Sequence, residues 1–397
     1  MLHRVVEPAV AVALDQYRSV TLADLARAAR LSPGAPYQHF KGKEQIFDEL
    51  AKSFGGALAS RLEAALASAP ARGNRLTGLY VALLEALAAE RDLFTLFREA
   101  EFAVGRKPYE ALLPVIEILE RAVAGSPARG HDEARALAWC LFSLAYFPAI
   151  VRSVWRDAGQ PPAADVAREL ARLARHGIEK GPARRAQPSK ASFYPAEETT
   201  PHPASLPARD RILSSAEQLF SEKGFSAATV SAIARHARVS DTAVFLHFRT
   251  KEELLGEVVG RIRADLGRAV RTETAGLARR ADFEEAGLLA FFGFLRERPG
   301  VYRIVREAEF VAPAVGQDYY RSLMAPYAAG LSAAAVAREV GTLDAAVTAQ
   351  ALMGLGHWLG LLAIVDGALD RETAVSVARR FVRRGLAAFV ADGREDR

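Results

Sequence analysis

The apolar positions of this chain recur at the spacing of α-helices. Over residues 209–223, one apolar stripe is formed by Ile212, Leu213, Ala216, Leu219 and Phe220. Gly224 follows directly, which is a typical stop signal for a helix. A β-hairpin would show two segments of alternating apolar and polar residues joined by a tight turn, and the sequence has no convincing signal of this kind. The pattern therefore predicts an all-α fold.

Polar residues that cap helices indicate where the next helices begin. Thr229 precedes a short second helix, Ser240 a third, and Thr250 with Glu253 forms a capping box before a long fourth helix. The N-terminal part of the chain carries equivalent signals at Thr21 with Asp24, Ser32 with Pro33, and Gly42 with Gln45. After each fourth helix, the pattern predicts five longer helical segments.

The two parts of the chain repeat one another. At an offset of 208, residues 21–50 match residues 229–258 at 12 of 30 positions, and FREAEF at 97–102 aligns with VREAEF at 305–310. Between the copies, residues 181–207 hold six of the nineteen prolines, a composition that favours an extended linker. We interpret the chain as a tandem duplication joined by this linker.

In each copy, two short helices joined by a tight turn predict a helix-turn-helix. Small residues stand where the helices would cross, at Ala26 and Ala234. The second helix of such a motif places its first turn against base edges in the major groove of DNA. In copy two, basic side chains flank that helix, at Arg235, His236, Arg238, Arg249 and Lys251. The alternative is a helical hairpin that only packs.

The motif itself resembles the DNA-binding domain of the TetR family of bacterial repressors. Both copies contain Thr, then Ala-x-x-Ala-x-x-Ser, then aromatic-x-His-Phe-x-x-Lys-Glu, over about 50 residues of each half. The resemblance implies three DNA-binding helices and a larger helical ligand domain in each half. It also implies that the last two helices of each unit form a four-helix bundle between subunits.

The resemblance implies roles for particular residues. Thr21 and Thr229 would meet phosphate, Tyr37 would contact phosphate through its hydroxyl, and Lys43 and Lys251 would contact the DNA backbone. The candidate DNA-contacting residues are Thr21, Ser32, Gly34, Ala35, Tyr37, Gln38, His39 and Lys43 in copy one, and Thr229, Ser240, Thr242, Ala243, Phe245, His247 and Lys251 in copy two.

The copies depart from the family pattern in different ways. Phe245 lacks the hydroxyl of the usual tyrosine, so copy two loses one phosphate contact. Pro36 removes an amide near the start of the recognition helix of copy one, and Pro8 interrupts its first helix. Arg30 and Arg238 stand at a turn position where glycine is common, which implies mild backbone strain or a different turn.

These signals divide the chain into five parts. They are a helix-turn-helix domain at 1–50, a helical ligand and dimerisation domain at 51–180, the linker at 181–207, a second helix-turn-helix domain at 208–256, and a second ligand and dimerisation domain at 257–397. Helices near 131–155, 163–180, 342–366 and 370–390 are the candidates for the bundle, with Gly356 and Gly360 permitting close helix approach. We expect the bundle to form within one chain as a covalent, monomeric pseudo-dimer, with further dimerisation allowed.

Aromatic side chains in the helical domains predict an apolar ligand pocket. The candidate residues are Phe94, Phe97, Arg98, Phe102, Tyr109, Trp139 and Tyr146 in copy one, and Tyr302, Arg306, Phe310, Tyr320 and Trp358 in copy two. Arg98 and Arg306 lie four positions before a phenylalanine. Their helices are either surface salt-bridge helices or carry a polar clamp at a pocket mouth. The expected effector is an apolar or amphipathic small molecule.

Composition and charge agree with this picture. The length of 397 residues favours two domains or more, and a net charge of +5 with a pI near 9.3 permits nucleic-acid binding. The longest apolar run, residues 137–151, is shorter than a bilayer requires, and no signal peptide is recognised, so we expect a cytoplasmic protein without a membrane partner. Cys140 stands alone among apolar residues, as a core residue would.

Two other classes of function remain open. An enzyme is disfavoured because the chain lacks GxSxG, HExxH, a phosphate-binding loop and paired CxxC motifs, and neither a cofactor nor a metal site is expected. The second alternative is a ligand-binding or scaffold protein that has lost DNA binding in one or both halves. Pro36 and Phe245 are the residues that favour it. The sequence names neither the operator nor the effector.

Overall fold

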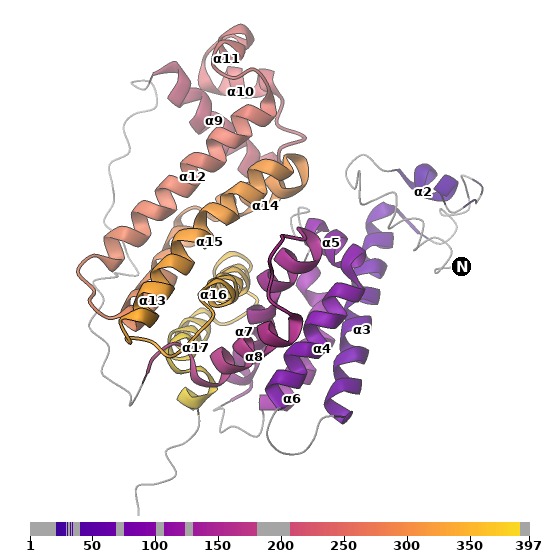
Figure 1. Cartoon of the computed structure of the whole chain (residues 1–397). Helices are drawn as coiled ribbons and strands as arrows, with labels where there is room; N and C mark the ends of the chain where they lie inside the picture. Colours follow the sequence, from indigo (N-terminus) through magenta and orange to yellow (C-terminus); the bar gives the residue numbers. More distant parts are fainter. Residues whose placement is uncertain are drawn as a thin grey trace, which may run out of the picture. The chain divides into compact units, whose positions relative to one another are not determined.

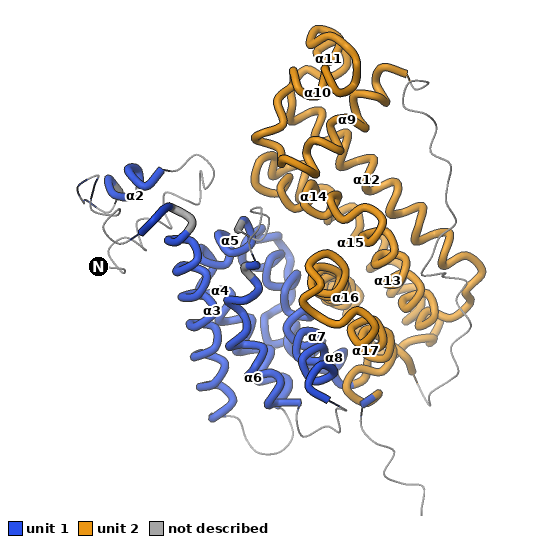
Figure 2. Tube along the Cα trace, turned by 180° about the vertical axis from the view of Figure 1, so that it is seen from behind, with its two compact units in different colours: residues 1–175, 389–397 blue, residues 176–388 orange. Residues whose placement is uncertain are grey.

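The computed structural model describes residues 21–28, 30, 32, 34, 40–68, 75–100, 107–123, 130–180 and 207–389. The chain forms two compact units, residues 1–175 with 389–397 and residues 176–388 (Figure 2). Within the described residues every regular element is helical, and an isolated bridge joins Glu179 to Val340. The all-α prediction is confirmed.

The described part of the first unit contains a short helix followed by longer ones. Its elements are α2 (Leu22–Ala28), α3 (Lys43–Ser68), α4 (Arg75–Ala89), α5 (Arg91–Ala100), η2 (Pro108–Leu112), α6 (Leu113–Val123), α7 (His131–Ala149), η3 (Ile150–Val154) and α8 (Ala163–His176). Five α-helices therefore follow the long helix α3 in the described residues, as the sequence predicts.

The second unit is also built of helices. Its elements are α9 (Ala208–Lys223), α10 (Val230–Ala237), α11 (Asp241–His247), α12 (Lys251–Thr274), α13 (Arg280–Glu297), α14 (Pro299–Val311), α15 (Pro313–Val336), α16 (Ala345–Leu359), η5 (Gly360–Val365), α17 (Arg371–Arg384) and η6 (Gly385–Phe389). Helices α9, α10 and α11 gather at one end of α12 (Figure 1).

The predicted caps hold the helix starts of the second unit. The hydroxyls of Thr229, Ser240 and Thr250 each accept a hydrogen bond from a backbone N–H three residues on, at 3.1 Å. The carboxylate of Glu253 accepts in return from the N–H of Arg249, the residue before the cap, at 2.9 Å, so Thr250 and Glu253 together hold the start of α12. These bonds satisfy N–H groups that the first helical turn leaves without partners.

The first unit shows two of the equivalent caps. The N–H of Thr21 donates to the Asp24 carboxylate at 2.9 Å, and the N–H of Asp24 donates to the Thr21 hydroxyl at 3.2 Å. Before α3, the Gln45 side chain accepts from the N–H of Lys41 at 3.0 Å. Thr21 and Asp24 therefore form a reciprocal capping box, whereas before α3 the bond from Lys41 to Gln45 is one-sided because Gly42 has no side chain.

Each unit contains one long apolar helix that ends in a π-helical turn, η3 after α7 and η5 after α16. The resulting segments, 131–154 and 345–365, are long and apolar enough to cross a membrane. The prediction from the sequence considered only the apolar run at 137–151, whereas the helix that contains this run extends over residues 131–154. The most apolar windows of these segments are 89% and 94% buried, which is typical of core helices. Cys140 lies fully buried in α7.

Glycines in α16 and η5 permit close helix packing, although the neighbour is α13 of the same unit. A Cβ atom on Gly360 would lie 2.7 Å from the side chain of Leu295. One on Gly356 would lie 3.5 Å from the ring of Phe291, which is ordinary contact. The close approach that these residues provide therefore serves the core of the second unit.

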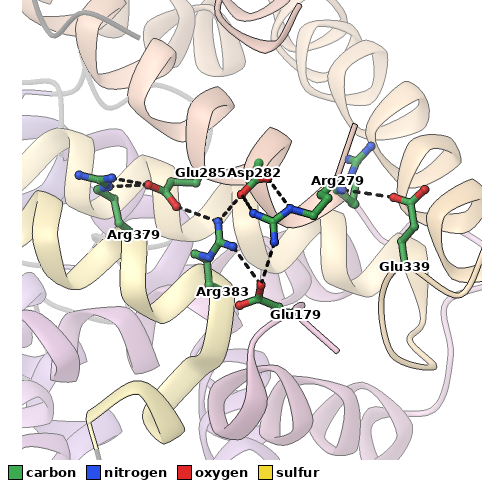
Figure 3. A network of polar contacts seen from close by, with 8 residues as sticks. Glu179, Arg279, Asp282, Glu285, Glu339, Arg379 and Arg383 are labelled. Atoms are coloured by element: carbon green, nitrogen blue, oxygen red, sulfur yellow. Dashed lines mark hydrogen bonds and ion pairs between the residues drawn. The ribbon is translucent and has the colours of Figure 1, made fainter. Parts of the chain in front are cut away.

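A buried network of charges ties the residues before the linker to the second unit (Figure 3). The backbone N–H of Glu179 donates to the carbonyl of Arg383 at 2.8 Å, and its carboxylate accepts from the Arg383 guanidinium at 2.9 Å. The same guanidinium reaches Asp282 at 2.7 Å and Glu285 at 3.1 Å. Residues 177–180, which follow the end of α8, thus belong with the second unit.

Candidate nucleic-acid interface

Helices α9, α10 and α11 form a helix-turn-helix around a small apolar core. Ala234 and Ala237 of α10 are buried, as are Val244 of α11 and Phe248 just after it. Small side chains at the crossing let α10 pack closely against its neighbours, as the sequence predicts. The arrangement leaves one side of α11 facing outward.

The turn between α10 and α11 is fixed by a left-handed residue. Arg238 has φ 54° and ψ 48°, and the N–H of the following Val239 donates to the carbonyl of Ala234 at 3.0 Å. Arg30 of the first copy has φ 55°. Both arginines therefore adopt the conformation that favours glycine, which confirms the unusual backbone expected at these positions.

The outward side of α11 carries two large apolar side chains together with polar ones. Thr242, Phe245, Leu246 and His247 are exposed, and Ala243 is half-buried. Asp241 is also exposed, but its carboxylate accepts a short hydrogen bond from the hydroxyl of Ser231 on α10. The predicted contact residues of copy two on α11 therefore lie on its accessible side.

Basic side chains stand beside this helix along the chain. Arg235 and Arg238 are exposed just before α11, and Arg249 is exposed just after it, with its guanidinium 3.3 Å from the Glu253 carboxylate. The ring of His236 is hydrogen-bonded to the hydroxyl of Ser215 at 3.0 Å. Positive charge on both sides of a recognition helix is suited to the phosphates that border a groove.

Lys251 is more deeply engaged than its sequence position suggests. Its ammonium donates to the carbonyls of Phe225 and Ala228 at 2.8 and 3.3 Å, and lies 4.2 Å from the centre of the Phe225 ring. Burial lowers the pKa of Lys251, against the opposing effect of Glu252 and Glu307. The lysine therefore joins the start of α12 to the loop that precedes α10.

Helix α14 also contacts this loop. The N–H of Phe225 donates to the buried carboxylate of Glu307 at 2.8 Å. Gly224 has φ +79°, and a Cβ atom there would lie 2.6 Å from the Arg303 guanidinium. The side chains of Glu307 and Arg303 thus fix the end of α9 and the loop before α10. Sequence reasoning missed both residues, since their partners lie some 80 positions away.

Part of the predicted site of copy one lies in the described residues. Thr21, Ser32 and Gly34 are exposed, and Lys43 is the first residue of α3. Ala35, Tyr37, Gln38, His39 and the two departures at Pro8 and Pro36 lie outside the described residues. The roles assigned to these residues remain predictions.

A comparison with protein-family models matches one segment in each half of the chain. The model for bacterial regulatory proteins of the tetR family matches residues 13–50 and 212–258. Each half of the chain therefore contains one segment that is similar to this family. The two matches end at residues 50 and 258, which is the offset of the internal repeat.

Curated transcriptional regulators are similar to a short part of this chain. The HTH-type transcriptional repressor KstR2 of Mycolicibacterium smegmatis is 36% identical over 70 residues, which is 18% of this chain and 34% of the relative. The HTH-type transcriptional regulator UidR of Escherichia coli is 38% identical over 53 residues, or 13% of this chain and 27% of that protein. The part of this chain that matches spans about a third of the length of KstR2 and about a quarter of that of UidR.

Solved structures of tetR-type regulators align with under half of this chain. A putative TetR-family transcriptional regulator from Rhodococcus sp. is 22% identical, with 43% of this chain and 94% of the other covered, at a TM-score of 0.37. The regulator FadR from Bacillus subtilis, solved in complex with stearoyl-CoA, is 18% identical, with 44% and 97% covered and a TM-score of 0.39.

Behind the tetR-family segment of copy one, aromatic residues of the predicted pocket come together. Phe94 lies 5.8 Å from Phe54 and 5.6 Å from Tyr146, between ring centres, and Phe97 lies 5.2 Å from Phe54. Phe54 of α3 was missed because an isolated aromatic in an amphipathic helix carries no distinct signal. Tyr109 and Trp139 are buried, and Phe102 lies outside the described residues.

The arginines of the repeated FREAEF and VREAEF motifs are buried. Arg98 and Arg306 are each 1% exposed, so the interpretation of a surface salt-bridge helix is wrong. Arg98 lies 5.9 Å from the ring of Phe94, while Arg306 pairs with the buried Glu309 and donates to the Tyr320 hydroxyl at 3.3 Å. In both copies, the arginine of this repeated motif therefore lies in the core.

The core of copy two also contains a polar pair. The Tyr302 hydroxyl is hydrogen-bonded to the ring of His357 at 2.5 Å, and His357 packs edge-on against Trp358 with ring centres 5.2 Å apart. Tyr302 and Trp358 were predicted pocket residues, and His357, which joins them, was not. Phe310 is only partly buried. At the repeat offset Tyr302 aligns with Phe94, so copy one has no hydroxyl at this position.

Proposed function

We propose that this protein is a sequence-specific DNA-binding transcriptional regulator that acts as a repressor in the cytoplasm. The observation that carries the proposal is the helix-turn-helix of copy two. It presents an exposed recognition helix between exposed arginines and lies within one of two tetR-family segments. No catalytic residue is assigned.

Selection of bound sequences from a random duplex pool tests this function. The full chain should enrich a defined sequence and bind it at least about a thousandfold more tightly than scrambled DNA at one salt concentration. Retention of all duplexes with equal affinity, or of none, would support the alternative of a scaffold or ligand-binding protein instead.

We further propose that the chain is a tandem duplication that binds its operator as a single-chain pseudo-dimer. The repeat at offset 208 and the two family matches support two DNA-binding heads in one chain. In a dimeric repressor, the second head comes from an identical subunit. Here the second copy takes that place, with half-sites spaced by about one helical turn or a multiple of it.

Replacing Lys251 with alanine should weaken binding to every DNA sequence and lower the salt dependence by about one counterion. An ammonium has three N–H donors, and the two carbonyl contacts of Lys251 use two of them. We assign the third N–H donor of Lys251 to a phosphate of the DNA. The measurement is the slope of log affinity against log salt concentration.

The matched control is Arg271→Ala on the same helix. Arg271 is exposed near the opposite end of α12, twenty residues and about 30 Å from Lys251. It should leave the slope unchanged. A loss of affinity in Lys251→Ala with an unchanged slope would show that the lysine only holds the loop before α10.

We also propose that an apolar or amphipathic effector binds among the aromatics of a helical domain and releases DNA. Helix α14 supports such coupling, because it carries both Tyr302 and Arg306 in the core and Glu307 at the DNA-binding loop. An effector shifts the DNA affinity only if it binds two arrangements of the heads unequally.

An effector of this class should weaken operator binding by about 5- to 150-fold at saturation, which is a coupling of about 1–3 kcal/mol. The measurement is operator affinity with and without each compound that binds the helical domain. Glu307→Ala should reduce this coupling, because it removes the acceptor of the Phe225 N–H. Binding of several such compounds without any change in DNA affinity would contradict the sensor role.

A further inference from the structure

The recognition helix of copy two lacks the side chains that usually read bases by hydrogen bonding. Its sequence, DTAVFLH, contains no arginine, lysine, asparagine or glutamine. These four residues make the common bidentate contacts to guanine and adenine in the major groove. Asp241 can accept from cytosine, but its carboxylate already accepts from the Ser231 hydroxyl.

Two large apolar side chains occupy the outward side of this helix instead. Among the described residues, the exposed large hydrophobic side chains are Phe245, Leu246 and Val336, and the first two are 52% and 80% exposed. Thr242, one turn earlier, adds a methyl group to the same side. Because these two side chains are so exposed, they bury little apolar surface within the fold. Their exposure therefore indicates a partner that covers them.

The charges around the pair indicate which partner covers it. Arg235, Arg238 and Arg249 are exposed on the segments directly before and after α11. Positive side chains beside an apolar helix match a groove that has phosphates at its edges and apolar groups on its floor. In the major groove of DNA, the apolar group on the floor is the 5-methyl group of thymine.

We propose that copy two recognises its half-site through thymine methyl groups, which Phe245 and Leu246 contact in the major groove. This inference rests on the proposed function and adds the chemistry of recognition. Burial of a methyl group from water is favourable, so each contact selects thymine over cytosine and over uracil, which lacks the methyl group. A half-site rich in T·A pairs is expected at the positions that face α11.

The test compares thymine with uracil in the same duplex. The probe is the most enriched duplex from the random pool, synthesised with thymine or with deoxyuridine at every T of one half-site. Uracil in the half-site of copy two should weaken binding of the full chain about fourfold for each methyl contact removed. Two contacts give roughly sixteenfold by the same scale.

Variants of the apolar pair assign the effect to these residues. The double variant Phe245→Ala, Leu246→Ala should bind the two duplexes equally when uracil replaces thymine in that half-site. In the other half-site, the double variant should distinguish thymine from uracil to the same extent as the wild type. Because both side chains are exposed, thermal unfolding should stay within about a degree or two of wild type for a small surface effect.

The outcomes separate the inference from the function. Specific binding with equal affinity for thymine and uracil would overturn the inference and leave the proposed function in place. So would a double variant that discriminates as the wild type does, because the pair would then serve another partner such as a protein surface. Absence of any sequence-specific DNA binding would overturn the proposed function itself.

Discussion

Duplicating either half-site of the operator into a perfect palindrome should weaken binding on the order of a hundredfold. The two copies present different recognition sequences, SPGAPYQ at 32–38 and SDTAVFL at 240–246. Gln38 can form hydrogen bonds to adenine, whereas Leu246 can form only apolar contacts. Each mismatched base pair costs about 1–3 kcal/mol, so two mismatches in one half-site give this loss.

The experiment uses the selected operator and its two palindromic versions at one salt concentration. We expect an asymmetric operator, with one chain bound per duplex in a single orientation. The number of chains per duplex should be measured alongside the affinity, for example by sedimentation of the complex. Equal or tighter binding to both palindromes would mean that the copies read the same bases or that two chains bind together.

Replacing Arg383 with leucine should destabilise the second unit by about 3–5 kcal/mol. Arg383 is the shared partner of Glu179, Asp282 and Glu285, whose side chains are 8%, 2% and 6% exposed. Removing the guanidinium takes away the one counter-charge that these three buried carboxylates share. Urea unfolding followed by circular dichroism measures the effect on the transition of the second unit.

Arg379→Leu is the matched control. The side chain of Arg379 is 48% exposed and pairs with Glu285 at 2.6 Å, so its loss should cost less than about 1 kcal/mol. A similar small loss in Arg383→Leu would show that the network is solvated and contributes little to stability.

The effect of Arg383→Leu should shrink as the pH falls. Burial raises the pKa of Asp282, but hydrogen bonds from Arg383 and Arg279 outweigh it, so the pKa lies below its usual value. In the wild type, this contribution is present above the pKa of the unfolded state and is lost on acidification. In the Arg383→Leu variant, a protonated Asp282 carboxyl is less costly to bury than an ionised one. The free energies of unfolding of the variant and the wild type should therefore approach one another toward acid pH.

Local signals explain why the helices of the DNA-binding segment could be predicted from the sequence. The caps at Thr229, Ser240 and Thr250 involve partners only three residues away. The unusual backbone of the turn could also be expected, because Arg238 stands at a position where glycine is common. Such features depend on neighbours along the chain, which the sequence displays directly.

Features that depend on distant residues were not predicted. The ammonium of Lys251 binds carbonyls 26 and 23 positions away, and Glu179 reaches Arg383 across 204 positions. Arg98 and Arg306 look like surface residues in the sequence because charge is usually exposed, yet both are buried. Only the packing of helices around them determines where these charges lie.

The most direct test of the account is the affinity of the full chain for its selected operator relative to a scrambled duplex of equal length and composition. Both should be measured at the same physiological salt concentration, since phosphate contacts alone bind any sequence. The account predicts a ratio of about a thousand or more, with both affinities falling as salt rises. Equal affinity for the two duplexes would contradict it.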